Sequence, residues 1–256
     1  METELFDLHA DIETTHWWFV GRRRIVNCLL SAAIPQQARQ TVVDIGCGTG
    51  GNVAALDGWK HRVGVDVSSS AIAAAQSNYP EITFKQGEAP RDLSETELDA
   101  DLFALMDVLE HVEDDESLLS EVVLQAKSGA HLLITVPANP ALWSQHDVSF
   151  GHFRRYTAGS LARLWRDLPV ETKLLSYFNS RLLPVIRTAR FVSQLRGKSI
   201  GRDQTDFFIP PQVVNNLLTE VFAGEAQRLR SGLGGQGQQP LPFRRGVSLI
   251  AILHRN

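Results

Sequence analysis

Short, almost wholly apolar runs alternate with stretches of helical periodicity over the first half of the chain. We predict a strand at each apolar run, at residues 42–45, 61–66, 82–84, 101–106 and 131–136. Helices are predicted between them, at residues 52–56, 68–77 and 113–127. Strands that are apolar along their whole length are usually buried on both faces. The alternation therefore predicts an α/β fold, in which helices cover both faces of a mostly parallel sheet.

Two further apolar runs, at residues 170–178 and 246–254, bring the predicted sheet to seven strands. The long stretch between them predicts a helical insertion before the last strand, serving as a lid or an oligomer contact. We therefore divide the chain into an N-terminal helical arm or cap (1–40), a main domain (41–180 and 241–256) and the insertion (181–240).

The insertion opens with a basic segment. Residues 181–198 carry five basic side chains and no acid, and Pro184 either breaks or starts the helix predicted there. The cations scatter around the helical wheel and share no face. Peripheral contact with a membrane surface is therefore an alternative that the pattern leaves open.

A cleaner amphipathic helix is predicted after Pro210 and Pro211. Its polar residues, Asn215, Asn216 and Thr219, lie opposite an apolar arc. The arc consists of Val213, Val214, Leu217, Leu218, Val221 and Phe222. We expect this arc to pack on the rest of the insertion or on a second subunit, so monomer and homodimer both stay open.

The N-terminal arm combines helical periodicity with an aromatic run. A short helix is predicted from the spacing of Leu5, Leu8 and Ile12. A second helix is predicted over residues 21–34, and Arg22 shares its apolar face. A buried arginine needs an anion, either a carboxylate of the protein or the carboxylate of a ligand. The aromatic run at 16–19, which includes Trp18, is either a latch onto the main domain or a cap over a ligand.

Composition narrows the functional class. The 256 residues are 43% hydrophobic and 21% charged, the balance of a globular chain. A net charge of −4 speaks against nucleic-acid binding, which usually needs a basic face. The two cysteines, Cys28 and Cys47, support neither a disulfide framework nor a cysteine metal site. No apolar run has the length of a membrane span, and the first residues lack a signal peptide's basic start, so we expect a cytoplasmic protein.

The first predicted strand runs into a glycine-rich turn. Asp44 lies near the end of the apolar run, and Gly46, Gly48 and Gly50 follow at alternate positions. Glycine permits positive φ angles and lets a ligand touch bare backbone. In parallel sheets ligands lie at the carboxyl ends of the strands. Four acids fall at or near such ends: Asp44, Asp66, Glu88 and Asp107. A rim of acids is hard to explain as core, and it predicts a cofactor site.

Two cofactors compete for this turn. Gly46, Gly48 and Gly51 also satisfy the G-x-G-x-x-G pattern of dinucleotide-binding turns. Asp44 argues against a dinucleotide, because a carboxylate beside the turn repels a pyrophosphate. S-adenosylmethionine instead presents an ammonium and a sulfonium group to Asp44. It also carries a ribose diol for Asp66 and an adenine amino group for an acid near Glu88.

Three segments, spread over about residues 40–140, resemble the class I S-adenosylmethionine-dependent methyltransferases. They are Asp44-Ile45-Gly46-Cys47-Gly48-Thr49-Gly50, Val63-Gly64-Val65-Asp66 and Met106-Asp107-Val108-Leu109-Glu110-His111-Val112. The resemblance implies a Rossmann-like fold, S-adenosylmethionine as cofactor and methyl transfer as activity. The arm, with its HWWF-x-GRR motif, and residues 146–156 are similar to a bacterial subgroup whose members often accompany polysaccharide or lipid biosynthesis enzymes.

The resemblance also implies individual roles. The glycine turn holds the methionine part of the cofactor, Asp66 binds the ribose hydroxyls, and Glu88 lies near adenine, where the family often has an aspartate. The cofactor-binding set that we predict is Arg22, Asp44, Gly46, Cys47, Gly48, Gly50, Asp66, Val67, Glu88, Ala89, Met106 and Asp107.

We expect the acceptor pocket in the long connection after the fifth strand, because functional residues concentrate in such loops. The predicted acceptor-binding residues are Trp18, His146, Arg154, Arg155 and Tyr156. An acceptor hydroxyl needs a base, and His111 and His152 are the candidates, since neutral imidazole takes a proton near pH 7. His146, Asp147 and His152 have an unusual spacing for a metal site and show no fourth ligand, so no metal is predicted.

The sequence thus predicts methyl transfer from S-adenosylmethionine to an oxygen of an unidentified small-molecule, glycan or lipid-linked acceptor. Two alternatives belong to other classes. One is a cofactor-binding regulatory or scaffold protein without turnover, and the other is an NAD-dependent oxidoreductase.

Overall fold

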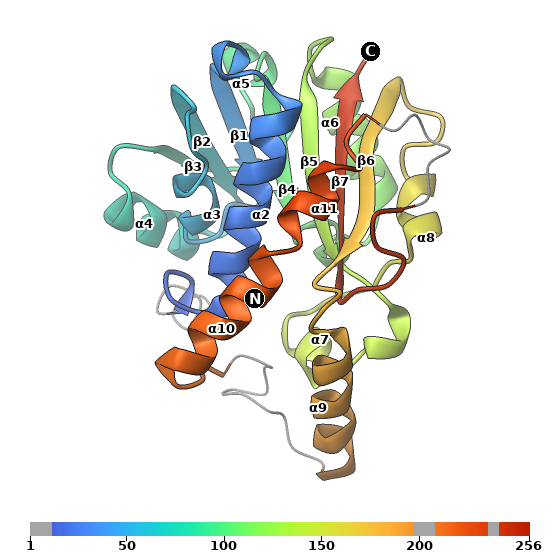
Figure 1. The fold of residues 1–256 in the computed structure, drawn as a ribbon. Coiled ribbons are helices and arrows are strands. Elements are labelled where there is room, and N and C mark those ends of the chain that lie inside the picture. Colours follow the sequence, from blue (N-terminus) through green and yellow to red (C-terminus); the bar gives the residue numbers. More distant parts are fainter. Residues whose placement is uncertain (1–11, 197–207, 235–240) are drawn as a thin grey trace.

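A computed structural model of the chain describes residues 12–196, 208–234 and 241–256, and these contain one seven-stranded sheet (Figure 1). The strands are β1 (Thr41–Ile45), β2 (His61–Asp66), β3 (Thr83–Gln86), β4 (Leu102–Met106), β5 (His131–Pro137), β6 (Val170–Phe178) and β7 (Ser248–Arg255). Their order is β3-β2-β1-β4-β5-β7-β6, and β7 runs antiparallel to both of its neighbours. The predicted mostly parallel sheet is confirmed.

Helices lie on both faces of this sheet (Figure 1). They are α2 (Trp17–Ala33), α3 (Gly51–Ala54), α4 (Ser69–Asn78), α5 (Glu95–Leu98), α6 (Asp115–Gln125), α7 (Gln145–Ser149), α8 (Ala158–Arg163), α9 (Leu183–Arg196), α10 (Gln212–Ala223) and α11 (Ala226–Arg230). The described residues also form short 3₁₀ turns, η1 (Gln36–Ala38), η2 (Leu109–His111) and η3 (Pro140–Leu142).

Two apolar layers hold the helices on the sheet. Val42 and Leu102 point to the layer that also contains Ile25 and Leu29 of α2 and Leu229 of α11. The alternate strand residues, such as Val43 and Phe103, point to the other layer, where α6 and α8 pack. Because successive side chains of a strand face opposite ways, strands buried on both faces need continuous apolar runs.

Register brings the ends of the central strands together. Ile45 at the end of β1 pairs with Val65 of β2 on one side and with Leu105 of β4 on the other. Asp66 and Asp107, which follow those partners closely in sequence, therefore lie at the same edge of the sheet as the glycine turn. The register thus gathers the predicted acids at one rim.

Helix α2 begins at Trp17, four residues before its predicted start. His16 caps it, because the imidazole Nδ1 accepts a hydrogen bond from the Trp18 backbone N–H at 3.2 Å. The aromatic run thus forms the first turn of the helix, and Phe19 lies on the same buried face as Arg22. Histidine is an uncommon cap, and the sequence carries none of the usual signals, Ser, Thr, Asp or Asn, at that position.

Helix α10 buries only part of its predicted apolar arc: Phe222 is fully buried, and Leu218 and Val221 pack half-buried against the core. The polar Asn215 and Thr219 are buried, whereas Val213, Val214 and Leu217 of the predicted apolar arc are exposed. The helix packs on α2 of the arm, and Phe222 of the arc shares an apolar cluster with Leu229 of α11 in the predicted insertion; contact of the arc with a second subunit stays a prediction.

Hydrogen bonding explains this orientation. The first N–H groups of a helix have no acceptor within the helix. Asn215 supplies one for α2, because its Oδ1 accepts from the Trp17 N–H at 2.9 Å, and its Nδ2 donates to the Thr15 carbonyl at 2.8 Å. Further along α10, Phe222 is fully buried and fills the space above Gly21, where a Cβ atom would lie 2.6 Å from its ring.

Replacing Phe222 with alanine is expected to lower the free energy of unfolding by about 3–5 kcal/mol, the usual cost of truncating a buried aromatic side chain. Leu217→Ala is the matched control on the same helix, and we expect less than about 0.5 kcal/mol because that side chain is 62% exposed. Denaturant unfolding of both variants measures the difference. A larger cost for Leu217→Ala would mean that α10 is rotated from the orientation described.

Two sequence predictions fall partly or wholly beyond the described residues: the helix based on Leu5 and Leu8, and the end of the basic segment after residue 196. Within the described part of α9, Arg190 is buried and donates to the Leu142 carbonyl at 2.6 Å, while Arg187 is exposed. No helix in the described ranges has both the length and the apolar character needed to cross a bilayer.

Candidate active site

The glycine turn after β1 has the backbone geometry that its sequence predicts. Gly46, Gly48 and Gly50 have φ angles of 68°, 54° and 86°, a region that other residues seldom adopt. A Cβ atom on Gly46 would also lie 2.7 Å from the Val108 side chain. Gly46 itself is exposed, so its backbone is open to a ligand.

Asp66 holds this turn against the neighbouring strand. Its Oδ2 accepts from the Gly48 N–H at 2.9 Å, and its Oδ1 accepts from the Ser68 N–H at 2.9 Å. The two backbone bonds orient the carboxylate at the rim and leave lone pairs for further donors. Val67, the next residue, is 68% exposed on the same edge.

Asp44 is the most unusual acid of the rim. Its side chain is buried within β1, and its Oδ2 has no hydrogen-bond partner among the described residues. Burial raises the pKa of this carboxyl to about 8; Arg22 opposes the rise and Asp66 adds to it. A buried carboxylate with an unpaired oxygen is costly unless a cation or a donor compensates it.

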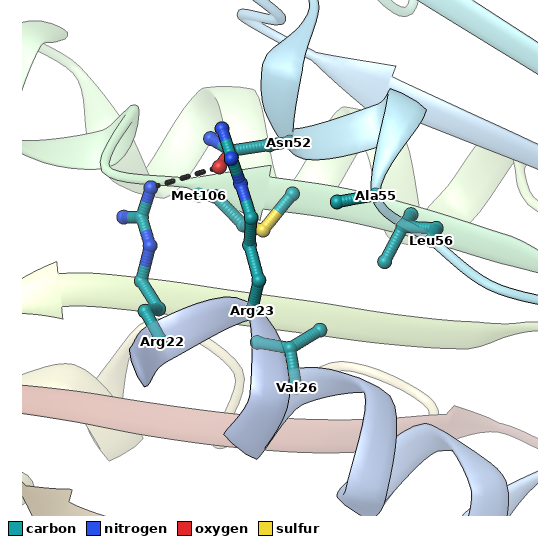
Figure 2. Close-up of a pocket in the computed structure, with 7 residues that line it drawn as sticks. All are labelled: Arg22, Arg23, Val26, Asn52, Ala55, Leu56 and Met106. Carbon is teal, nitrogen blue, oxygen red and sulfur yellow. Dashed lines mark hydrogen bonds between the residues drawn. The ribbon is translucent and has the colours of Figure 1, made fainter. Parts of the chain in front are cut away.

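Arg22 reaches from α2 to the end of β4. Its guanidinium forms an ion pair with Asp107, donates to Asn52 Oδ1 at 3.1 Å (Figure 2), and stacks 4.2 Å from the centroid of the Trp18 ring. Of the two anions that the sequence left open for Arg22, the structure thus contains the protein carboxylate. Thr135 Oγ1 also donates to Asp107, at 3.1 Å.

Asp107 has a φ of 60°, in the left-handed region that non-glycine residues rarely occupy. Such a backbone persists where surrounding contacts enforce it, often at functional sites. Here the Asp107 N–H donates to the Thr135 carbonyl at 2.9 Å, and Arg22 holds the side chain.

The remaining cofactor candidates differ in their surroundings. Glu88 is exposed and pairs with Arg91 at 2.6 Å, whereas Ala89 beside it is buried. Cys47 is buried, and burial raises the pKa of its thiol. Met106 is also buried and lines a narrow crevice between α2 and α3, where Figure 2 shows it among its neighbours.

The two candidate bases lie together. The rings of His111 and His152 are 4.7 Å apart between centroids and almost perpendicular. His111 follows β4 through η2, and His152 comes from the connection after β5. The His152 Nδ1 lies 3.0 Å from Oδ1 of Asp147, and the ring of His146 is 6.3 Å from that of His152. Burial lowers the pKa of His146 well below its usual value.

The other predicted acceptor residues bond within the chain. Arg155 is buried and donates to Asp147 Oδ1 at 2.7 Å and to the Ala138 carbonyl at 2.9 Å. Tyr156 donates from its hydroxyl to Asp115 Oδ2 at 2.6 Å, and Arg154 pairs with Oδ1 of the same Asp115 at 2.5 Å. These contacts fasten the connection after β5 to the domain.

A family model described as a methyltransferase domain matches residues 17–181, more than half of the chain. The chain belongs to the class I S-adenosylmethionine-dependent methyltransferases. Membership in this family goes against the oxidoreductase alternative.

Curated relatives of this methyltransferase include two trans-aconitate 2-methyltransferases. Those of Azoarcus sp. (strain BH72) and Deinococcus radiodurans are each 32% identical to it, over 120 and 114 residues. Each match covers 43% of this chain and 44% or 43% of the relative, so the chain spans less than half the length of the curated relatives it matches.

Solved structures show the same fold. The plantazolicin methyltransferase BamL, in complex with a triazolic desmethylPZN analog and SAH, has a TM-score of 0.57 at 14% identity, covering 99% of this chain and 90% of that one. The [4+2]-cyclase SpnF has a TM-score of 0.55 at 15% identity, covering 91% and 80%. Identities this low support the fold only, and the cyclase illustrates that one fold serves different reactions.

The methyltransferase contains functional candidates that the sequence reading did not assign. Glu13 of the arm is buried over the turn, where a Cβ atom on Gly51 would lie 2.3 Å from its Oε2, and burial raises its pKa. Asn179, just after β6, is fully buried with φ 53° and has no side-chain hydrogen bond within the described residues. No sequence signal links either residue to the site.

Glu110 is the third such residue. It is fully buried, and neither carboxylate oxygen has a hydrogen-bond partner in the described part of the chain. Burial raises its pKa well above the ordinary value, and Asp107 adds to the rise. In the sequence, Glu110 lies between Asp107 and His111, in a segment that resembles the family. That position is the signal that could have marked it as a site residue.

Proposed function

We propose that the chain transfers the methyl group of S-adenosylmethionine to an oxygen atom of a small-molecule, glycan or lipid-linked acceptor. The observation that carries this proposal is the buried Asp44 carboxyl beside the glycine turn, with one oxygen unpaired among the described residues. A ligand that presents an ammonium and a sulfonium group compensates such an acid. A pyrophosphate in the same place provides no such compensation and opposes ionisation of Asp44.

The residues at the rim fit this cofactor. When bound, S-adenosylmethionine supplies an electrophilic methyl group on a sulfonium. The chain's own contribution is to hold and orient it. Asp44 compensates the cofactor's positive charge, the exposed backbone of Gly46 allows close approach, and Asp66 accepts from the ribose hydroxyls with its remaining lone pairs. Asp107, fixed by Arg22 and Thr135, borders the same space.

In this proposal the acceptor's hydroxyl binds beside the imidazole rings of His111 and His152. His111 and His152 come from the segments after β4 and β5, whose carboxyl ends share the rim with the glycine turn. Methyl transfer to a hydroxyl needs its oxygen positioned in line and its proton removed. We assign removal of that proton to His111 and His152. Because trans-aconitate is named in the curated relatives, small carboxylates belong among the acceptors to test.

Two measurements test the proposal. Calorimetry with S-adenosylmethionine, with NADH as comparison, is expected to detect binding of the first alone. Incubation with panels of phenols, hydroxy acids, carboxylates, sugars and lipid-linked glycans is expected to release demethylated cofactor with at least one acceptor. Cofactor binding without turnover across the panels would favour the regulatory alternative, and lack of cofactor binding would overturn the proposal.

Replacing His152 with alanine is expected to slow turnover by about 10²–10⁴-fold, the usual contribution of a group that handles the acceptor's proton. The affinity for S-adenosylmethionine should stay within a factor of about two, because the change lies on the acceptor side. His61→Ala is the matched control, since His61 is exposed at the opposite end of β2. Unchanged turnover in His152→Ala would contradict the acceptor assignment.

A further inference from the structure

The imidazole pair and the Glu110 carboxylate together form a group of three potential metal ligands. One ligand atom each from Glu110, His111 and His152 lie within 4.8 Å of one another. Transition-metal ions bind imidazole nitrogen and carboxylate oxygen at about 2.0–2.2 Å, so two ligands of one ion are at most about 4.4 Å apart. Three ligands spaced evenly around one ion at that distance lie about 3.8 Å apart, so closing the group by up to about 1 Å brings all three onto one ion.

The Glu110 carboxylate independently points to a cation. It is completely buried, and both of its oxygens are without a hydrogen-bond partner among the residues that the structure describes. A buried acid ordinarily has a donor, a counter-ion or a metal. At least one of its oxygens lies within 4.8 Å of a ring nitrogen of each imidazole, and the side chain of His152 is itself 8% exposed.

A further contact prepares His152 for ligation. Its Nδ1 lies 3.0 Å from Asp147 Oδ1, so the Nδ1–H donates to the carboxylate and Nε2 keeps a free lone pair. Metal-bound histidines usually donate their second nitrogen to a carboxylate or carbonyl in this way. Asp147 is itself fixed, because it accepts from Arg155 Nε at 2.7 Å and from the Ser144 N–H at 2.9 Å.

We propose that Glu110, His111 and His152 bind one divalent transition-metal ion, of the series from Mn²⁺ to Zn²⁺. Two imidazoles and one carboxylate suit these ions, whereas Mg²⁺ and Ca²⁺ prefer oxygen ligands. This assignment departs from the sequence expectation of no metal, which concerns His146, Asp147 and His152.

The ion has a role at the acceptor, and this part rests on the proposed function. Three protein ligands leave at least one coordination position open. An acceptor oxygen occupies that position, and the ion lowers the pKa of its hydroxyl, as bound metals do for water. With the ion bound, the acceptor's proton passes to solvent, and the imidazoles assist its loss as ligands of the ion.

Co²⁺ is the probe for the test, since its visible absorption reports nitrogen and oxygen ligation. We expect the chelator-treated chain to bind one Co²⁺, and Glu110→Gln and His152→Ala each to weaken binding more than about tenfold. Asp147→Asn, a positioning variant, should weaken it less. Glu113→Gln and His61→Ala, both changes at exposed residues, are the matched controls and should match the unmodified chain.

Co²⁺ binding by the unmodified chain no tighter than by Glu110→Gln would overturn the proposal. Circular dichroism checks that each variant folds, and if Glu110→Gln does not, His111→Asn with His152→Asn decides on the same criterion. Calorimetry with S-adenosylmethionine separates the two proposals. Cofactor binding without Co²⁺ binding overturns the metal site alone, and Co²⁺ binding without cofactor binding overturns the proposed function alone.

Discussion

Asp44→Ala is expected to weaken S-adenosylmethionine binding by at least about 100-fold. Removing one partner of a buried charge pair costs several kcal/mol, and each 1.4 kcal/mol is about a factor of ten in affinity. Asp44→Asn should weaken binding by a similar factor, since the amide keeps the shape and loses the charge. Calorimetry measures both variants, with Glu116→Gln on the exposed side of α6 as the control. Unchanged affinity in Asp44→Ala would remove the basis of the cofactor site.

The same residue predicts a pH dependence. The folded, ligand-free chain holds Asp44 with a pKa of about 8, so the carboxyl is mostly protonated near pH 7. A cationic ligand favours the ionised form, so binding below pH 8 releases a proton, and affinity rises with pH up to about 8. Calorimetry in two buffers of different ionisation enthalpy counts that proton. Asp44→Asn, treated identically, reports the titration of the cofactor itself.

The stability of the cofactor-free chain, in contrast, should fall as the pH rises. A carboxyl whose folded pKa is raised from 3.8 to about 8 loses stabilising free energy as the pH rises between those values. At pH 7 the cost approaches about 4 kcal/mol, at about 1.4 kcal/mol per pH unit. Asp44→Asn is therefore expected to melt at a higher temperature than the unmodified chain at pH 7–8 and to lose this advantage near pH 4. A stability difference independent of pH would contradict the buried-acid interpretation.

Asp147→Ala is expected to lower the free energy of unfolding by about 3–5 kcal/mol, because it leaves Arg155 buried without its carboxylate partner. The side chain also accepts from the Ser144 N–H at the start of α7. Denaturant unfolding measures the loss.

A double-mutant cycle sharpens this prediction. Arg155→Met alone leaves the Asp147 charge buried, so it should also be costly. The pair Asp147→Leu with Arg155→Met removes both charges, and it should cost less than the sum of the two single changes. Additive costs would mean that the ion pair contributes nothing beyond packing.

Much of the sheet was readable from the sequence, because a strand buried on both faces requires a local apolar run. The predicted bounds of β2 agree with the structure, and β6 spans its predicted 170–178. The glycine turn was equally local, since positive φ angles at Gly46, Gly48 and Gly50 demand that residue type. Family resemblance then connected the turn to its cofactor.

Helix orientation was not readable in the same way. The apolar arc of α10 exists in the sequence, but only part of it is buried, because Asn215 on the polar side bonds to the first turn of α2, nearly two hundred residues away. Periodicity predicts the buried face of a helix from where its apolar residues lie. It does not account for a hydrogen bond between a polar side chain and another helix. The same limitation hid His16 as the cap of α2.

The sequence by itself determined the fold class, the glycine turn and the acids of the rim, because each rests on residues close together in the chain. Only the tertiary structure decided which groups those residues meet. It paired Arg22 with Asp107 and used Arg154, Arg155 and Tyr156 to fasten the connection after β5. It also placed the Glu110 carboxylate beside two imidazoles with no hydrogen-bond partner among the described residues. Burial and pairing depend on distant segments, so the chemistry of the acceptor side could not be read from local pattern.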